Sequence, residues 1–184
     1  MNDERMILTP RLRIVPFAEQ HLTERYVGWL NDPEVVRFSE QRFVRHTLAS
    51  CRAYWSSFEG SHNCFWAIEL AGGDTSERHI GNINAYVDRN NGLADVGILI
   101  GDRRIWGKGC GAEAWRAVCN WLFTHLNMRK ITAGTLSCNL GMLAIMDRTG
   151  MVDDGKRVRH YLFEGEEVDM VYRAMFNSNL LGER

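Results

Sequence analysis

The sequence predicts one mixed α/β domain whose mostly antiparallel sheet has about six to seven strands flanked by about four to five helices. Three observations support this prediction. Apolar runs of strand length alternate with stretches of helical periodicity. Turn signals separate the central runs, as in an antiparallel meander. One long amphipathic segment after the fourth predicted strand has the length of a crossover helix. With 184 residues, the chain has the size of a single domain, which we expect to span residues 1–184.

The N-terminal third is predicted to contain one strand and two helices. Residues 6–17 alternate apolar and polar residues, as a half-buried strand does. The spacing of apolar residues predicts a helix over 18–32, which the Asn-Asp-Pro sequence at 31–33 ends. We expect a short helix or turn at 33–41 and a second amphipathic helix at 46–58.

Three strands are predicted in the middle of the chain, at 63–70, 77–89 and 93–101. These segments are rich in apolar and β-branched residues. Gly-Gly-Asp at 72–74 and Asn-Asn-Gly at 90–92 separate them and are typical of tight turns. The three segments are therefore expected to pair as an antiparallel meander.

The strongest predicted helix follows a glycine-rich stretch, because seven apolar residues fall on one helical face. They are Ala112, Trp115, Val118, Cys119, Leu122, Phe123 and Leu126. After this helix we expect a strand at 129–137, a helix at 140–150 closed by Gly150, and a final pair of strands around Gly165.

The composition argues against several classes of protein. The net charge of −1 gives no electrostatic reason to expect a nucleic-acid partner. The five cysteines are scattered without metal or redox spacing, and no metal is expected. The N-terminus has no signal-peptide pattern and no apolar run reaches the ~20 residues of a membrane helix. We therefore expect a cytoplasmic protein with no membrane partner.

The stretch Trp106–Ala112, "WGKGCGA", suggests a backbone that binds an anion in front of a helix. A nucleoside-triphosphate loop requires G-x-x-x-x-G-K-[ST], but Gly101 is one residue too far from Gly107 and glycine replaces the hydroxyl residue. A dinucleotide site requires an acidic residue about 20 positions later. Because the chain has no Asp or Glu between Glu113 and Asp147, that reading also fails.

These residues resemble the GNAT superfamily of N-acetyltransferases, whose signature is [QR]-x-x-G-x-[GA]. Gly109 and Gly111 occupy the two small positions, whereas Trp106 stands where Arg or Gln is usual. The run "WGKGCGAEA" is similar to the branch that includes the ribosomal-protein N-terminal (Rim-type) acetyltransferases. Residues 26–38, 93–101 and 139–151 also resemble segments of that branch, so the resemblance spans most of the chain.

The resemblance implies a GNAT-like fold and acetyl-CoA as co-substrate, with direct transfer of the acetyl group to a primary amine. Backbone amides from Gly107 to Ala112 would bind the pyrophosphate of the coenzyme. The implied cofactor-binding residues are Leu99, Ile100, Trp106, Gly107, Lys108, Gly109, Cys110, Gly111, Ala112 and Asn139.

The resemblance also implies catalytic residues. Asp95 occupies an acidic position on the strand at 93–101 and is the candidate base, although it could equally belong to the polar face of an alternating strand. A backbone N–H near Leu99 or Ile100 would bind the developing oxyanion. Asn139 could hydrogen-bond the pantetheine arm, or could cap a helix. Met146 stands where many relatives have the tyrosine that protonates the leaving thiolate.

The acceptor is the least specified part of the prediction. Trp29 is a candidate substrate-binding residue, because the first helices line the amine site in the branch that this chain resembles. Glu34 is a second candidate, since it could attract a cationic amine, or it could equally belong to a solvated helix start. We expect a small-molecule amine such as a nucleotide-linked amino sugar. The alternatives are a protein N-terminus and a non-catalytic acyl-CoA-binding module, and a homodimer stays open.

Overall fold

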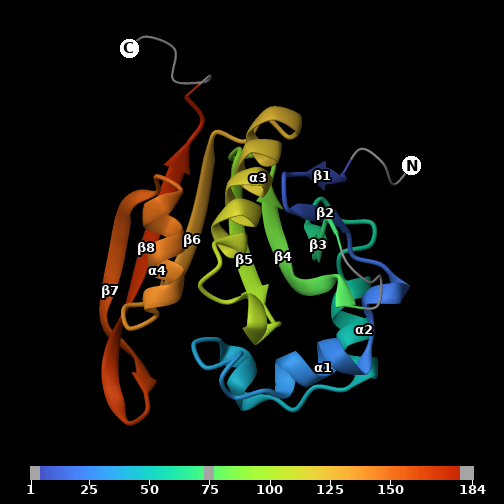
Figure 1. The fold of residues 1–184 in the computed structure, drawn as a ribbon. Helices are drawn as coiled ribbons and strands as arrows, with labels where there is room; N and C mark the ends of the chain where they lie inside the picture. The colour runs from blue at the N-terminus through green and yellow to red at the C-terminus, as the bar shows by residue number, and fades with distance from the viewer. Residues whose placement is uncertain (1–4, 73–76, 179–184) are drawn as a thin grey trace.

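The computed structural model describes residues 5–72 and 77–178. In this part of the chain, eight strands form one sheet in the order β1-β2-β3-β4-β5-β6-β8-β7, and four α-helices pack against it (Figure 1). The strands are β1 (Ile7–Leu8), β2 (Leu12–Pro16), β3 (Cys64–Leu70), β4 (His79–Asp88), β5 (Leu93–Ile100), β6 (Lys130–Leu136), β7 (Val152–Phe163) and β8 (Glu166–Phe176). The helices are α1 (Glu24–Asn31), α2 (Leu48–Ser56), α3 (Cys110–His125) and α4 (Leu140–Arg148), with short 3₁₀ turns η1 (Glu19–His21), η2 (Glu40–Phe43) and η4 (Arg103–Ile105).

The sheet confirms the predicted mixed, mostly antiparallel architecture, with roughly the expected numbers of strands and helices. Neighbouring strands are antiparallel except β5 and β6, which are parallel and are joined by the crossover helix α3. A parallel neighbour requires such a crossover, because a tight turn can only join antiparallel strands. The strongest predicted helix is therefore the element that makes the sheet mixed.

The prediction of a single strand over residues 6–17 was wrong, because these residues form a hairpin of two strands. β1 and β2 pair antiparallel, with Ile7 opposite Ile14. Thr9 closes the turn, because its backbone N–H donates to the carbonyl of Leu12 at 2.9 Å. Pro10 lies in the turn, where its missing N–H costs nothing.

The first helix is shorter than predicted and begins at Glu24. Thr23 caps it by accepting a hydrogen bond from the amide of Tyr26, so the preceding residues form only η1. The turn predicted at 72–74 extends beyond the described residues. From β3 to α4 the observed bounds agree with the predicted ones within two residues, whereas β7 begins at Val152 rather than at residue 157.

Two apolar cores lie on the two faces of the sheet. The core on the α3 face is centred on Trp66, Trp115 and Leu122. The core on the other face joins α1 and α2 to the sheet through Trp29, Cys51 and further apolar residues. Along β3 the residues alternate between these cores, as period-two side-chain geometry requires. β5 follows the same rule: Ala94 and Val96 belong to the α3-side core, and Asp95 between them faces the other way.

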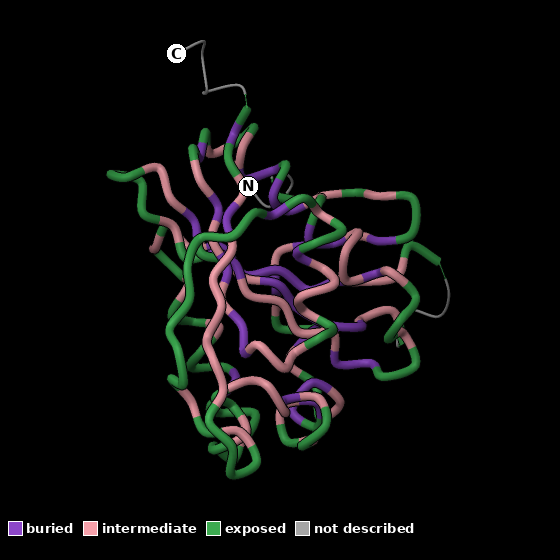
Figure 2. The backbone as a smooth tube through the Cα atoms, turned by 90° about the vertical axis from the view of Figure 1, so that its left-hand side faces the viewer, coloured by how far each residue is buried: buried purple, intermediate pink, exposed green. Residues whose placement is uncertain are grey.

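The edge strand β7 is exposed along nearly its whole length (Figure 2). It carries charged residues at half of its exposed positions, which protects an edge strand against pairing with other chains. Over residues 5–72 and 77–178, no helix is long and apolar enough to cross a membrane.

A cluster of aromatic rings lies between α1 and the sheet and contains the partly buried His79. Its ring lies 5.0 Å from that of Trp29 and 5.1 Å from that of His21, measured between centroids. Burial, followed by the charge of His21, lowers the pKa of His79 from 6.5 to about 3, although Glu69 acts in the opposite direction. His79 therefore stays neutral in the folded protein at pH values where the unfolded chain binds a proton.

This histidine should make the protein less stable in mild acid. Between pH 6.5 and about 3 the unfolded chain binds a proton at His79 that the folded chain excludes. The free energy of unfolding should fall by up to about 1.4 kcal/mol per pH unit across this window through this group alone. Urea denaturation from pH 7 to 4 should therefore give a shallower pH dependence for His79→Phe than for the wild type. Equal slopes for the two proteins would contradict this assignment.

Candidate active site

The central feature of the site is the separation of β5 from β6. The two strands pair in parallel at three positions, from Leu93 opposite Lys130 to Asp95 opposite Thr132. β5 then continues to Ile100 paired with β4, and β6 continues to Leu136 paired with β8. Within the described residues, the carboxyl-terminal half of β5 therefore has one hydrogen-bonding edge that β6 does not fill (Figure 1).

The register shows which amides face this open edge. Amides of a strand point alternately to its two neighbours, and Gly101 donates to the carbonyl of Ile80 on β4 at 2.9 Å. Leu99 consequently faces β4, where it pairs with Asn82. The amides of Ile98 and Ile100 point toward the side that β6 has left. Of the two residues named for the oxyanion, this geometry favours Ile100.

The glycine stretch forms a tight turn that leads into α3. Gly107 and Gly109 have φ of +73° and +82°, in the left-handed region, and Gly109 is the N-terminal cap of the helix. Cys110 opens the helix and is buried, which raises the pKa of its thiol. Gly111 faces α4, because a Cβ there would stand 3.0 Å from Ile145. Ala112 follows in the first turn.

Hydrogen bonds from the Trp106 side chain and from the Lys108 backbone join the turn to the residues before it. The indole N–H of Trp106 donates to the carbonyl of Ile100 at 2.7 Å, which ties the start of the turn to the end of β5. The Lys108 amide donates to the carbonyl of Ile105 at 3.3 Å. The Lys108 side chain is exposed. The side chain of Trp106 is thus bound to the backbone of β5.

Sequence reasoning missed a second support of the turn, which comes from the β1–β2 hairpin. Arg11 donates through Nη1 to the carbonyl of Lys108 at 2.8 Å and through Nε to the carboxylate of Glu113 at 2.6 Å. Thr9 also donates to Glu113, at 2.6 Å. Arg11 lies 97 residues from Lys108 along the chain. Because no local pattern links them, only the tertiary structure reveals the contact.

Asp95 lies where the parallel pairing ends, with its side chain on the face opposite α3. Thr132 of β6 donates to its Oδ2 at 2.7 Å. Asp95 is exposed, although the neighbouring strands partly desolvate its carboxylate. Burial raises the pKa of Asp95 and the Thr132 hydrogen bond opposes this effect. A raised pKa makes a carboxylate a better proton acceptor near neutral pH.

Asn139 directly precedes α4 and Met146 lies within it, beyond the end of β6. Asn139 caps the helix: its Oδ1 accepts from the Met142 amide at 3.2 Å, and its Nδ2 donates to Thr135 at 3.0 Å. The capping alternative is therefore what the structure shows, and contact with a pantetheine arm stays a prediction. Met146 is fully buried in the α3-side core.

Trp29 reaches the end of β5 from α1. A Cβ on Gly101 would stand 2.0 Å from its ring, so only glycine allows this packing. Arg25 lies over the same ring, 5.1 Å from its centroid, and donates to Asp102 at 2.7 Å. The hydrogen bond from Arg104 is the main cause that lowers the pKa of Asp102. Trp29 is itself buried, so it can form a wall of the site but presents little surface.

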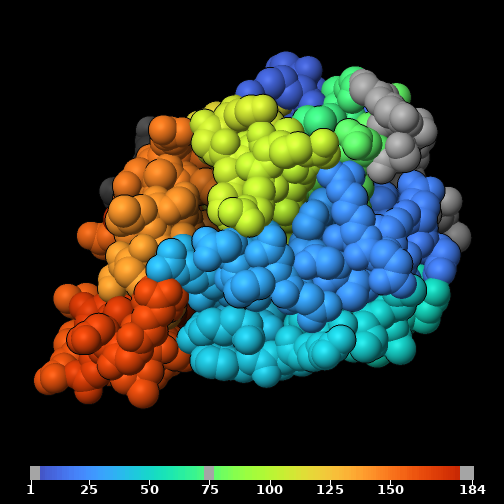
Figure 3. All heavy atoms as spheres, turned by 60° about the horizontal axis from the view of Figure 1, so that its bottom comes forward, coloured from blue at the N-terminus to red at the C-terminus, as the bar shows by residue number. Residues whose placement is uncertain are grey.

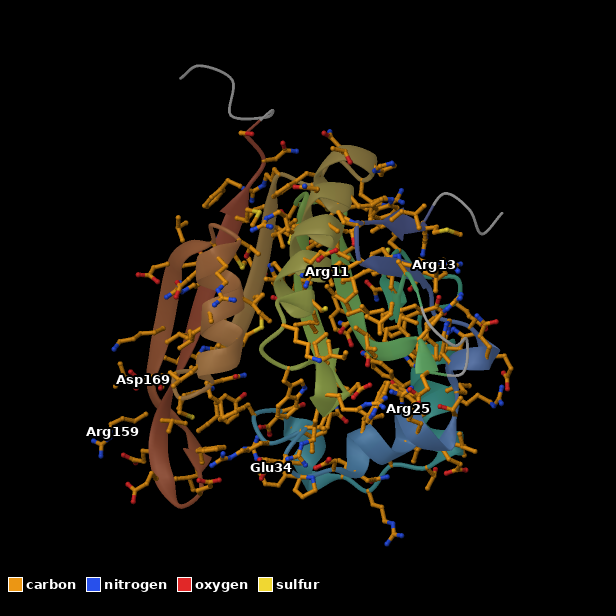
Figure 4. The ribbon with its side chains drawn as sticks, in the orientation of Figure 1. Arg11, Arg13, Arg25, Glu34, Arg159 and Asp169 are labelled. Carbon is orange, nitrogen blue, oxygen red and sulfur yellow. The ribbon has the colours of Figure 1, made fainter. Side chains whose placement is uncertain are left out.

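Glu34 is exposed on the segment after α1, at the lower edge of Figure 4, and its amide donates to Asp32. Three residues later this segment meets the tip of the β7–β8 hairpin. Arg37 donates to Glu164 at 2.7 Å, and the Phe38 and Phe163 rings stack with centroids 5.2 Å apart. We call these four residues the hairpin-tip contact. Figure 3 shows the two segments touching.

The arrangement fits the phosphates and thioester arm of an acyl-coenzyme A. The turn offers backbone amides and a helix N-terminus for a pyrophosphate, without a side chain at Gly109. The open edge of β5 offers amides to an extended amide-rich arm, which could add to the sheet as a strand does. Asp95 lies at the inner end of that edge, on the face where an amine could approach.

Comparison with known proteins supports this interpretation of the geometry. A family model described as "Acetyltransferase (GNAT) domain" matches residues 11–152. The "N-acetyltransferase 9-like protein" of Caenorhabditis briggsae is 23% identical over 155 residues, which cover 80% of this chain and 77% of that protein.

Two solved structures are similar over nearly the whole chain. The spermidine N-acetyltransferase from Vibrio cholerae, in complex with CoA and spermine, has a TM-score of 0.80 and 16% identity, covering 95% of this chain and 100% of that chain. The ribosomal-protein-S5-alanine acetyltransferase from Vibrio fischeri has a TM-score of 0.79 and 14% identity, covering 95% and 97%. At these identities the likeness concerns the fold.

The glycine turn can be tested directly with Gly109→Ala. An L-residue at a φ of +82° is strained by about 1–2 kcal/mol. If the turn relaxes to relieve this strain, its amides no longer point together at the pyrophosphate. The affinity for CoA, measured by titration calorimetry, should then fall about tenfold. The control is Gly28→Ala in α1, where a Cβ would meet nothing within 4 Å. If the folded Gly109→Ala protein binds CoA as tightly as the wild type, the turn is not part of the CoA-binding site.

Proposed function

Because the chain belongs to the GNAT acetyltransferase family and is an acyltransferase, we propose that it moves the acetyl group of acetyl-CoA directly to a primary amine. The family membership confirms the resemblance found in the sequence. The fold neighbours include ribosomal-protein acetyltransferases, in agreement with the branch that the glycine stretch resembled. The non-catalytic alternative loses its support, since relatives matched by sequence are named as N-acetyltransferases.

The observation that carries the proposal is the open edge of β5 between a proton acceptor and an anion-binding turn. Asp95 stands at the closed end of this edge, and Trp106–Gly109 follow its open end. Five residues, 96–100, lie between Asp95 and Gly101, which directly follows β5, so both ends of this edge can serve one extended co-substrate. The acetyl thioester supplies an activated carbonyl carbon.

Asp95 would prepare the amine for attack. A primary ammonium is mostly protonated at neutral pH, and Asp95 accepts its proton directly or through a water molecule. The amine nitrogen then forms a C–N bond with the acetyl carbon while the C–S bond breaks. A backbone amide on the open edge of β5 would face the carbonyl oxygen as it gains negative charge, and Ile98, three residues from Asp95, is better placed for this than Ile100, which lies about 16 Å from Asp95 along the strand. A positioned base of this kind contributes about 10²–10⁴-fold in rate.

The leaving thiolate needs no acid from α4 in this scheme. Met146 has no proton to donate and is fully buried, so it cannot take the role of the usual tyrosine. A thiol with a pKa near the ~8.5 of free cysteine is a good leaving group, and its thiolate can take a proton from solvent. This departure from the family pattern is therefore compatible with catalysis.

For the acceptor we propose a small-molecule primary amine, such as an amino sugar, with a protein N-terminus as the second candidate. The hairpin-tip contact supports both, because Arg37 and Glu164 join the segment after α1 to the β7–β8 hairpin. We expect the acceptor to enter beside this contact, as a small amine or as an extended chain end. The similar proteins include an alpha/beta-tubulin N-acetyltransferase and a ribosomal-protein-S5-alanine acetyltransferase, which also favour the second candidate.

The test is the release of thiol from acetyl-CoA in the presence of a panel of amines. The panel should contain polyamines, free and nucleotide-linked amino sugars, and peptides with free N-termini. We expect one class to accelerate thiol release, and Asp95→Asn to lower kcat about 10²–10⁴-fold while CoA affinity changes little. If the protein binds acetyl-CoA but no amine accelerates thiol release, the proposed acetyl transfer is wrong.

The pH profile offers an independent check on Asp95. The base must be ionised to accept a proton, so activity falls as the pH drops through its pKa. Thr132→Val removes the hydrogen bond that lowers this pKa. The acidic limb of the kcat/KM profile should move to higher pH, with little change in the plateau. Thr124→Val, at the far end of α3, is the control, and an unmoved limb in Thr132→Val would argue against Asp95 as the base.

A further inference from the structure

The proposed cofactor site contains an arginine contact that the family signature does not account for. Trp106 occupies the position where Arg or Gln is usual, and its indole binds the backbone of Ile100. At the same turn a guanidinium arrives from the other end of the sheet, because Arg11 reaches Lys108 and Glu113 from the β1–β2 hairpin. Figure 4 shows Arg11 beside α3 and Arg13 farther along β2.

An anion-binding turn works only if its amides point to the anion and its carbonyls point away. Gly109 already supplies its carbonyl to the first helical bond, from Glu113 at 3.1 Å. The carbonyl of Lys108, one residue earlier, lies outside the helix. Arg11 binds this carbonyl at 2.8 Å, which fixes the peptide plane between Lys108 and Gly109. The amide of Gly109 belongs to that plane, so its direction is fixed as well.

Arg11 is itself held in place. The carboxylate of Glu113 accepts from its Nε and from its backbone amide, and Thr9 binds the same carboxylate. Burial acts to raise the pKa of Glu113, but the hydrogen bonds from Thr9 and Arg11 outweigh it and the pKa is lowered. A planar guanidinium with several donors can hold a carboxylate and a carbonyl together, which a lysine ammonium does less well.

We propose that Arg11 is a positioning residue for the phosphates of the coenzyme: by holding the Lys108 carbonyl it orients the turn amides toward the pyrophosphate. This inference rests on the proposed function, since it concerns the same co-substrate. Arg11 and Trp106 then fix the turn from two sides, at Lys108 and at Ile100. The third nitrogen, Nη2, lies 3.4 Å from where a Cβ on Gly109 would stand, so the positive charge also borders the turn.

The experiment compares CoA with pantetheine, the part of the coenzyme that lacks the phosphates. Arg11→Gln should weaken the binding of CoA about tenfold, measured by titration calorimetry, because one charge-assisted hydrogen bond is lost. The binding of pantetheine should change less than twofold. The matched control is Arg13→Gln, because Arg13 lies on β2 two residues after Arg11. This variant should bind both ligands as the wild type does.

A second variant guards against misfolding, because Arg11→Gln alone leaves the Glu113 carboxylate without its main partner. The double variant Arg11→Gln/Glu113→Gln removes both charges and keeps a polar group for Thr9. It should show the same selective loss of CoA affinity. The proposal is overturned if the double variant binds CoA as tightly as the wild type, or if it loses CoA and pantetheine affinity equally. Failure of the wild type to bind CoA would instead contradict the proposed function.

Discussion

The short parallel pairing between β5 and β6 is the constraint on which the rest of the structure depends. Parallel neighbours require a crossover, and the crossover here contains α3 together with the glycine turn at its start. Pairing at three positions holds the two strands together at one end only. If β6 continued along β5, it would occupy the amides of Ile98 and Ile100, and the sheet would have no open edge to offer a co-substrate.

The glycine turn illustrates how far a binding site depends on distant parts of the chain. Its left-handed glycines make the turn sterically accessible, but they do not select one orientation of its peptide planes. That selection comes from Trp106 on one side and Arg11 on the other. The N-terminal hairpin, which forms one edge of the sheet, therefore contributes to a site near its centre.

The two faces of the sheet differ in function: one carries the main apolar core and the other carries Asp95. The α3 face buries a continuous apolar core, which includes Met146. On the opposite face α1 and α2 cover the first strands, and the polar residue Asp95 stays partly accessible beside them. Trp29 packs on Gly101 at the junction, and the hairpin-tip contact joins the α1 segment to β7 and β8. The acceptor side is thus assembled from the beginning and the end of the chain.

The sequence by itself determined the order and type of nearly every element from β3 to β8, because periodicity, turns and caps act over a few residues. It also determined the glycine turn and its family, since the spacing of Gly109 and Gly111 is local. Only the tertiary structure decided which amides of β5 stay open, that residues 6–17 fold back as a hairpin, and that Arg11 supports the turn. These features depend on strand register and on contacts between residues far apart in the chain. A pattern of neighbouring residues cannot predict either of them.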